Sequence, residues 1–251
     1  MTGKIQALVL FIVWAVVSAA GIAVASAIDY FPSPGSLEAH TIDNAMTVMM
    51  VLSVPVFTMV VVLLVYSMVR FRHNGEPEED GPPIQGNLPL EVTWVVVTFA
   101  LTVFLAGYGI RELLALRSHG HGAEAAQNEL VVEARGSRWF WQFTYPEQGI
   151  ASSPELVLPV GRRVRFQVTA SDVIHSFWVP SFRSKIDAVP GITTTVYATP
   201  DRVGSFKEDY NFRVQCAELC GLGHATMKSS VTVVEQKDFD AWVSQKKGAS
   251  N

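Results

Sequence analysis

Two cysteines, a histidine and a methionine lie within one short stretch of this sequence. Residues 215–227 read QCAELCGLGHATM, and the chain has no other cysteine. Thiolate, imidazole and thioether groups together form the ligand set that copper prefers. Methionine is a poor zinc ligand, and structural zinc sites are usually built from four cysteines or histidines, so zinc fits less well. The spacing indicates a copper site or, as an alternative, a disulfide loop.

The number of cysteines distinguishes one copper ion from two. A mononuclear blue-copper centre uses one cysteine, two histidines and a weak axial methionine. Cys216 and Cys220 exceed that set by one thiolate, and two thiolates on one loop can each bridge two metal ions. A copper pair needs a second imidazole besides His224, and His175 in SDVIHSFWVP is the only other histidine in the same predicted domain. A single histidine beside an apolar run is more often a packed core residue, so His175 becomes a ligand candidate only if copper binds.

The ligand candidates belong to a predicted β domain. From Leu130 onward, short runs rich in β-branched and aromatic residues are separated by Pro, Gly and Ser. This pattern predicts an all-β sandwich or barrel over residues 130–236. Residues 237–251 have helical spacing, with Phe239, Trp242 and Val243 on one face, and we expect that face to pack against the β domain.

The first half of the chain is predicted to lie in a membrane. Three uncharged stretches, 8–27, 45–69 and 92–110, each approach or exceed the roughly 20 apolar residues needed to cross a bilayer. Residues 1–27 are either a cleavable signal peptide, since the stretch ends in ASA, or an extra transmembrane helix. The other two stretches predict a helical hairpin within residues 28–117. Residues 118–129, which include His119 and His121, are expected to be a linker.

Charge predicts the topology and excludes one class of partner. Arg70 and Arg72 directly follow the second apolar stretch, which places that loop in the cytoplasm and everything after about Arg111 outside, in the periplasm or its equivalent. Residues 118–251 contain fourteen basic and fourteen acidic residues, so no basic surface is available for phosphates. Nucleic acid is therefore not an expected partner.

Three segments resemble subunit II of haem–copper cytochrome c oxidases: DVIHSFWVP, KIDAVPG and CAELCGLGHATM. The resemblance implies a membrane helical hairpin followed by a cupredoxin-like β-barrel that carries the dinuclear copper centre called CuA. It implies that Cys216 and Cys220 bridge both copper ions. His175 and Met227 are then expected to complete one copper, and His224 with the backbone carbonyl of Glu218 the other.

The same resemblance implies roles for three more groups. The Glu218 side chain is expected to face a magnesium or manganese ion shared with subunit I, although a solvated loop acid is the simpler interpretation of this residue alone. RWFWQF resembles an aromatic run of the family, which places Trp139 at the point of electron entry; an aromatic strand by itself indicates only core packing. LEVTW places Glu91 at the mouth of a proton pathway, and a carboxylate at a helix start is also favoured by the helix dipole.

The function implied is that of the electron-entry subunit of a terminal oxidase in a bacterial-type plasma membrane. Electrons would come from an external cytochrome c or a small copper protein and pass to haem in subunit I, where oxygen is reduced and protons are translocated together with other oxidase subunits. A membrane-tethered copper carrier and a metal-free scaffold with a disulfide are the alternatives. Donor docking in this family often uses an acidic face, and four acids near the ligand segments are candidates for it: Asp172, Asp187, Glu208 and Asp209.

Overall fold

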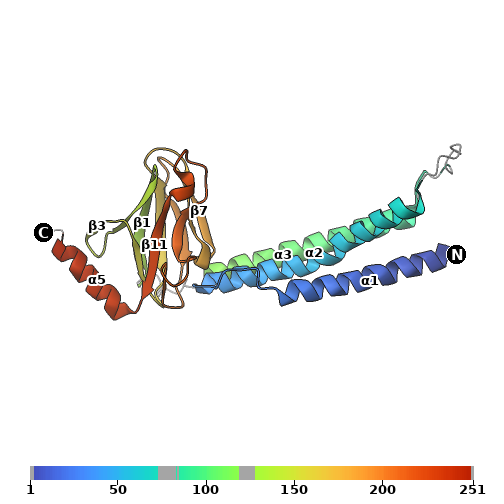
Figure 1. Ribbon diagram of the computed structural model, residues 1–251, viewed down its shortest axis with the longest axis horizontal. Coiled ribbons are helices and arrows are strands. Elements are labelled where there is room, and N and C mark those ends of the chain that lie inside the picture. Colours follow the sequence, from blue (N-terminus) through green and yellow to red (C-terminus); the bar gives the residue numbers. More distant parts are fainter. Residues whose placement is uncertain (1–2, 73–82, 84, 119–127, 250–251) are drawn as a thin grey trace. The chain divides into compact units, whose positions relative to one another are not determined.

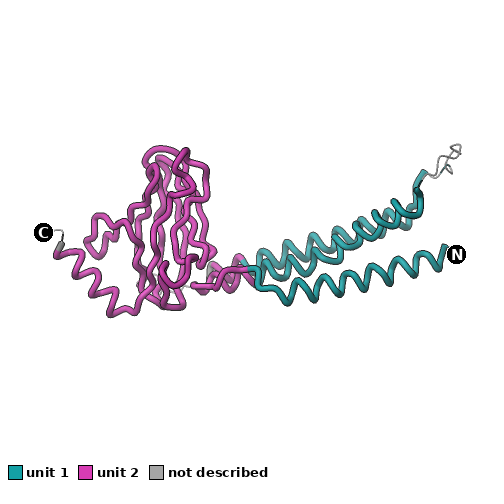
Figure 2. Tube along the Cα trace, viewed as in Figure 1, with its two compact units in different colours: residues 1–30, 44–112 teal, residues 31–43, 113–251 magenta. Residues whose placement is uncertain are grey.

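The computed structural model describes residues 3–72, 83, 85–118 and 128–249, and most of the predicted linker, with His119 and His121, lies outside the described residues. The chain forms two compact units, coloured separately in Figure 2. One unit contains residues 1–30 and 44–112, and the other contains residues 31–43 and 113–251.

Three long apolar helices account for the first unit (Figure 1). They are α1 (Gly3–Ala27), α2 (Leu37–Arg70) and α3 (Leu88–Ser118). The helices α2 and α3 are longer than the apolar stretches at 45–69 and 92–110, because helix continues into the polar residues at both margins. The most apolar 18-residue windows of the three helices are only 6%, 6% and 0% buried within the chain. So much exposed apolar surface is stable only in contact with lipid or with other membrane helices.

Polar groups join α1 to α2 within this unit. The Trp14 indole Nε1 donates a hydrogen bond to the carbonyl of Pro55 at 2.8 Å, and the hydroxyls of Ser18 and Thr58 lie 2.7 Å apart. Hydrogen bonds of this kind stabilise helix pairs in a bilayer, where no water is available as a substitute partner.

Two β-sheets form the main part of the second unit. One has the order β3-β2-β1-β5-β8, and the other has the order β4-β11-β10-β6-β7, with β9 paired to β11. The strands are β1 (Leu130–Ser137), β2 (Phe140–Tyr145), β3 (Ile150–Ser153), β4 (Leu156–Pro159), β5 (Val164–Ala170), β6 (His175–Val179), β7 (Ser184–Ala188), β8 (Thr194–Ala198), β9 (Gly204–Ser205), β10 (Arg213–Cys216) and β11 (Lys228–Val234).

Alternation of apolar and polar residues produces the core between the sheets. Successive side chains of a strand point to opposite faces, and along β5 the residues at every second position, from Val164 to Ala170, are buried. Large buried aromatic residues fill the interior, among them Trp141, Phe166 and Phe177. The predicted order of apolar helices followed by an all-β domain is confirmed.

The C-terminal helix covers one end of this core. The helix α5 (Gln236–Ala249) buries Phe239 and packs Trp242 and Val243 against the core, as its spacing predicts. The rings of Trp242 and Tyr145 lie 5.1 Å apart in an edge-to-face arrangement. Tyr145 is itself buried, and its hydroxyl donates a hydrogen bond to the carbonyl of Val157 at 3.0 Å.

The β domain also holds a segment that the sequence analysis assigned to the membrane hairpin, namely residues 31–43. Arg183 donates to both carboxylate oxygens of Asp43 at 2.7 Å. The buried Glu38 carboxylate accepts hydrogen bonds from the backbone and hydroxyl of Thr199 at 2.7 and 3.0 Å. The apolar spans do not reveal this attachment, because it depends on partners about 140–160 residues away in sequence.

Candidate metal centre

Pairing among three strands brings the distant ligand candidates together. The strand β10 lies between β6 and β11, and Cys216 at its end pairs with Phe177 of β6. His175 begins β6, two residues before that pair, so its side chain is on the same face as Phe177. On the other side, the Cys216 backbone N–H donates to the carbonyl of Met227 at 3.0 Å. The sheet therefore places His175, Cys216 and Met227 together at one end of three neighbouring inner strands.

The loop between β10 and β11 provides the remaining candidates. It contains Cys220 and a short 3₁₀ turn, η2 (His224–Thr226). Gly221 adopts φ +113°, a backbone conformation that residues with a Cβ rarely adopt. A glycine at this position allows the loop to reverse direction directly after Cys220.

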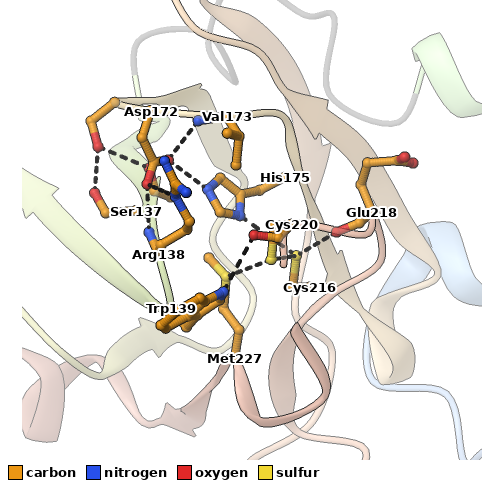
Figure 3. Close-up of polar contacts among 12 residues, drawn as sticks. Ser137, Arg138, Trp139, Asp172, Val173, His175, Cys216, Glu218, Cys220 and Met227 are labelled. Carbon is orange, nitrogen blue, oxygen red and sulfur yellow. Dashed lines mark hydrogen bonds and ion pairs between the residues drawn. The ribbon is translucent and has the colours of Figure 1, made fainter. Parts of the chain in front are cut away.

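The donor atoms of these residues converge on two thiols (Figure 3). The sulfur atoms of Cys216 and Cys220 lie 3.8 Å apart, and both cysteines are free. His175 Nδ1 is 3.8 Å from Cys216 Sγ, and His224 Nδ1 is 3.7 Å from Cys220 Sγ. An S–S bond is about 2.05 Å long, so the thiols are close enough to share a metal but are not joined to each other.

Two weaker donors complete the group. The Met227 sulfur lies 3.8 Å from Cys220 Sγ, and the Glu218 backbone carbonyl lies 3.3 Å from Cys216 Sγ. Figure 3 shows the Glu218 carboxylate pointing away from the sulfur atoms, and this side chain is exposed. Glu218 therefore presents its backbone carbonyl to the cluster, while its carboxylate is exposed at the surface.

The site is buried, which affects how it can take up a metal. Burial raises the pKa of the Cys220 thiol to about 11, and the hydrogen bond and charge of Cys216 act in the same direction. The metal-free Cys220 thiol is therefore protonated at neutral pH, and a metal ion that binds it must displace a proton. Two thiols, two imidazoles and a thioether fit copper better than zinc, magnesium or calcium.

Asp172 determines which nitrogen of His175 faces the thiols. His175 Nε2 lies 2.9 Å from a carboxylate oxygen of Asp172, and an ionised carboxylate can only accept hydrogen bonds. Burial alone would raise the pKa of Asp172, but hydrogen bonds from His175, Arg138 and the Val173 backbone hold this pKa well below its usual range. Because Nε2 carries the proton, the Nδ1 lone pair is directed toward Cys216.

Trp139 contacts the metal loop through its indole ring. The ring rests on Gly223 and Gly221: a Cβ added at Gly223 would lie 2.5 Å from the Trp139 ring, and one added at Gly221 would lie 3.6 Å away. The indole Nε1 donates a hydrogen bond to the Cys220 carbonyl at 3.3 Å. Trp139 is 42% exposed, so it connects the surface of the domain to a ligand candidate.

Glu91 is not part of this cluster. It lies in the first turn of α3, where its carboxylate accepts a hydrogen bond from the Asn87 backbone N–H at 2.9 Å. The Asn87 side chain in turn accepts from the Leu90 backbone N–H at 3.2 Å. This is a helix-capping arrangement, the simpler of the two roles expected for Glu91.

Three residues shape the site in a way that the sequence analysis did not predict, although it named Asp172 as a candidate for donor docking. Asp172 stands three positions before His175, a spacing that could have suggested a carboxylate partner. A Cβ on Gly136 would approach the His175 ring to 3.0 Å, so a glycine makes room for that imidazole. Gly223 does the same for Trp139. The two glycines carry no sequence signal, because their neighbours come from other strands or loops.

Two family models and several relatives match this chain. The family model of the cytochrome c oxidase subunit II periplasmic domain matches residues 150–234, and that of the subunit II transmembrane domain matches residues 23–111. Cytochrome c oxidase subunit 2 of Thermostichus vulcanus is 32% identical over 84% of this chain and 76% of its own length. The corresponding protein of Alkalihalophilus pseudofirmus is 35% identical over 77% of this chain.

The match to the Alkalihalophilus protein covers 56% of that protein's length. Among solved structures, the periplasmic domain of subunit II of cytochrome oxidase (CoxB) of Bradyrhizobium japonicum is 35% identical. It aligns with 48% of this chain and 94% of its own, with a TM-score of 0.43.

Proposed function

Because this chain belongs to the cytochrome c oxidase subunit II family, we propose that it is the electron-entry subunit of a membrane-bound terminal oxidase. An external cytochrome c or small copper protein supplies electrons, and a haem-bearing subunit I receives them. Reduction of oxygen to water and proton translocation take place in subunit I, with which this chain and other oxidase subunits assemble.

One observation carries the proposal: three side-chain donors and one backbone carbonyl surround two adjacent, unpaired thiols. His175 and the Glu218 carbonyl are nearest to Cys216, whereas His224 and Met227 are nearest to Cys220. These residues suit a dinuclear copper centre, because two thiolates that both metal ions could share would leave one imidazole for each ion.

The ligand positions suit rapid electron exchange. When bound, such a copper pair accepts and releases one electron, with the charge shared between the two ions. The chain's contribution is to restrain the ligands: His175 and Cys216 are part of paired strands, and Asp172 holds the His175 ring. Ligands held on a rigid sheet move little when the charge of the site changes.

Trp139 provides the route from the surface. Its exposed ring can contact a donor, and its hydrogen bond to the Cys220 carbonyl leads directly to a residue that would hold the copper. This geometry supports the role of Trp139 as the electron-entry residue, and it uses no other protein group between the ring and the ligand.

Two further roles belong to the same proposal. The exposed Glu218 carboxylate binds a magnesium or manganese ion together with subunit I, because it points away from the sulfur atoms and is free to contribute oxygen ligands. Glu91 lies at the mouth of a proton pathway formed with subunit I, and its capping role at the start of α3 is compatible with this function.

The proposed location is a bacterial-type plasma membrane, with the copper domain on the periplasmic face. Arg70 ends α2, which supports a cytoplasmic connection between α2 and α3. We propose that α2 and α3 form the transmembrane hairpin. Residues 1–27 either add a third transmembrane helix or are removed as a signal peptide.

Copper binding to the full chain in detergent tests the proposal. We expect two copper ions per chain and an electron paramagnetic resonance spectrum of one electron shared over both. Cys216→Ser and Cys220→Ser should each abolish this spectrum. Glu218→Gln should retain it, since only the backbone carbonyl of Glu218 faces the cluster.

Other results would contradict the proposal. A four-line spectrum from one copper ion would identify a mononuclear carrier instead. A copper-free protein with Cys216 and Cys220 oxidised to each other would indicate a metal-free scaffold.

A further inference from the structure

The helix α1 meets α2 through a buried polar contact. Ser18 is the one buried residue of α1, and Thr58 is buried in the apolar span of α2. Their hydroxyl oxygens lie 2.7 Å apart, so the buried hydroxyl of each helix meets that of the other. Buried residues are otherwise rare in these two helices, whose most apolar windows are each 6% buried.

A second hydrogen bond crosses the same interface. Trp14 is half-buried, and its indole Nε1 donates to the Pro55 carbonyl at 2.8 Å. Trp14 and Ser18 are four residues apart, so they project from one side of α1. In a bilayer no water can replace such partners, and hydrogen bonds between helices therefore favour their association.

The backbones of the two helices also approach closely. A Cβ added at Gly21 would lie 2.8 Å from Cγ1 of Val54, a distance that real Cβ atoms essentially never show. Gly21 is three residues beyond Ser18 and lies on the same side of α1. A small residue at such a position is typical of helix pairs in membranes, because it lets the backbones come together.

The covered side of α1 extends over most of its length. Buried or half-buried residues recur every three or four positions, as one side of a helix requires. They include Gln6, Leu10, Trp14, Ser18, Gly21 and Ala25. Ala25 is also the first residue of the ASA that fits a signal-peptide cleavage site, so packing against the rest of the protein is a second explanation for small residues there.

The contact with α1 does not use the groove between α2 and α3. This groove has a volume of about 570 Å³, and Val56 and Val60 of α2 are among its lining residues. Residues two positions apart on a helix point to roughly opposite sides, so Val56 and Val60 face away from Val54 and Thr58. A retained α1 therefore does not compete with a partner helix that packs into the groove.

We infer that residues 1–27 are a permanent transmembrane helix of this protein, bound to the α2 surface formed by Val54, Pro55 and Thr58. Removal of α1 would take the Ser18 hydroxyl away from Thr58 and expose this turn of α2 to lipid. With α1 retained, the chain crosses the membrane three times, and Lys4 lies on the same side as Arg70, in agreement with the positive-inside rule. The inference decides between the two roles left open for residues 1–27.

Identification of the N-terminus tests the inference on the unmodified protein. The full chain is produced in a bacterium with an active signal peptidase and purified from its membranes in detergent. We expect intact-mass measurement and peptide mapping to find residues 3–27 in the large majority of chains. A mature chain that begins directly after Ala27 would overturn the inference.

A pair of engineered cysteines tests the contact with α2. Ser18→Cys and Thr58→Cys are combined in a chain whose native thiols are removed by Cys216→Ser and Cys220→Ser. Because the two hydroxyl oxygens lie 2.7 Å apart, sulfur atoms at these positions can form a disulfide of about 2.05 Å. Mild oxidation of the membranes should therefore protect both thiols from a maleimide.

The matched control combines Val17→Cys with Thr58→Cys in the same chain. Val17 is exposed and points to a different side of α1, so its thiol should stay reactive after oxidation. Equal protection of the Ser18 and Val17 pairs would contradict the assigned contact.

A glycine substitution tests the close approach of the backbones. Gly21→Leu should lower the disulfide yield of the Ser18 and Thr58 pair severalfold, because the added side chain meets Val54. Gly109→Leu in α3, where no atom lies within 4 Å of an added Cβ, should leave the yield unchanged. An equal effect of the two changes would overturn the interface. None of these measurements involves copper or an electron donor, so their failure would leave the proposed function intact.

Discussion

The Asp172 carboxylate accepts a hydrogen bond from His175 Nε2 at 2.9 Å, while Nδ1 of the same ring lies 3.8 Å from the Cys216 sulfur. One acid therefore selects the His175 tautomer and the ring orientation that a metal ion requires. Arg138 holds the acid through its backbone and its guanidinium, so the orientation of His175 also depends on the residue next to Trp139.

Replacing Asp172 tests this relationship. Asp172→Ala should lower the affinity for copper roughly 10- to 100-fold, because the Nε2 proton loses its acceptor and the ring can adopt the other tautomer. Asp172→Asn keeps an acceptor oxygen and should have a smaller effect. Copper titration followed by absorbance measures both effects, and nitrogen NMR of the metal-free protein reports the His175 tautomer. Asp187→Ala, at an exposed acid of β7, is the control, and an equal loss in that variant would contradict the role of Asp172.

Gly223 is expected to be essential for the position of Trp139 rather than for metal binding. Gly223→Ala would place a methyl group 2.5 Å from the indole ring and must displace it. We expect the copper content to stay the same and reduction by a protein donor to slow by roughly tenfold, since small displacements of positioned groups are costly. Stopped-flow reduction measures this rate. A small chemical reductant should reduce the unmodified protein and Gly223→Ala at the same rate.

Gly248→Ala in α5 is the matched control, because no atom lies within 4 Å of the added Cβ. If a protein donor reduces Gly223→Ala as fast as it reduces the unmodified protein, the contact between Trp139 and the loop is not part of electron entry.

The contact between Asp43 and Arg183 should stabilise the β domain. Their side chains are 18% and 10% exposed, so Asp43→Ala leaves a largely buried guanidinium without its carboxylate. The expected loss is about 3 kcal/mol in the free energy of unfolding. Denaturant unfolding of the full chain in detergent, followed by near-ultraviolet circular dichroism, measures it. Asp29→Ala, at an exposed acid before the segment, should change stability by less than about 0.5 kcal/mol.

Asp209 should make the free energy of unfolding of the β domain depend on pH. Burial by itself raises the pKa of Asp209, but hydrogen bonds from Asn211 and Arg202 lower it below the usual value. A carboxyl with a lowered folded-state pKa stabilises the fold fully above its unfolded pKa of about 3.9, and this contribution is lost as the pH falls through the folded value. Asp209→Asn should therefore destabilise the protein by about 1 kcal/mol at neutral pH.

The difference in the free energy of unfolding between the unmodified protein and Asp209→Asn should shrink as the pH falls below about 4. Unfolding measured over a series of pH values tests this dependence. A difference that stays constant from neutral to acidic pH would show that the Asp209 charge does not contribute.

Much of the fold could be predicted from local patterns. The alternation in β5 and the helical spacing of Phe239, Trp242 and Val243 are properties of neighbouring residues, and the structure places these side chains in the core. The helix lengths were less predictable: α2 begins at Leu37 because polar residues outside the apolar span continue the helix.

The sequence by itself determined the types of ligand available and their spacing between Cys216 and Met227, since both are local properties of the chain. It also determined the apolar membrane spans and the strand pattern. Only the tertiary structure decided that His175 meets Cys216, that Asp172 orients His175 and that Trp139 rests on Gly223. These contacts join residues from different strands and loops, and strand pairing sets their distances. Residue type and periodicity alone do not encode which strands become neighbours.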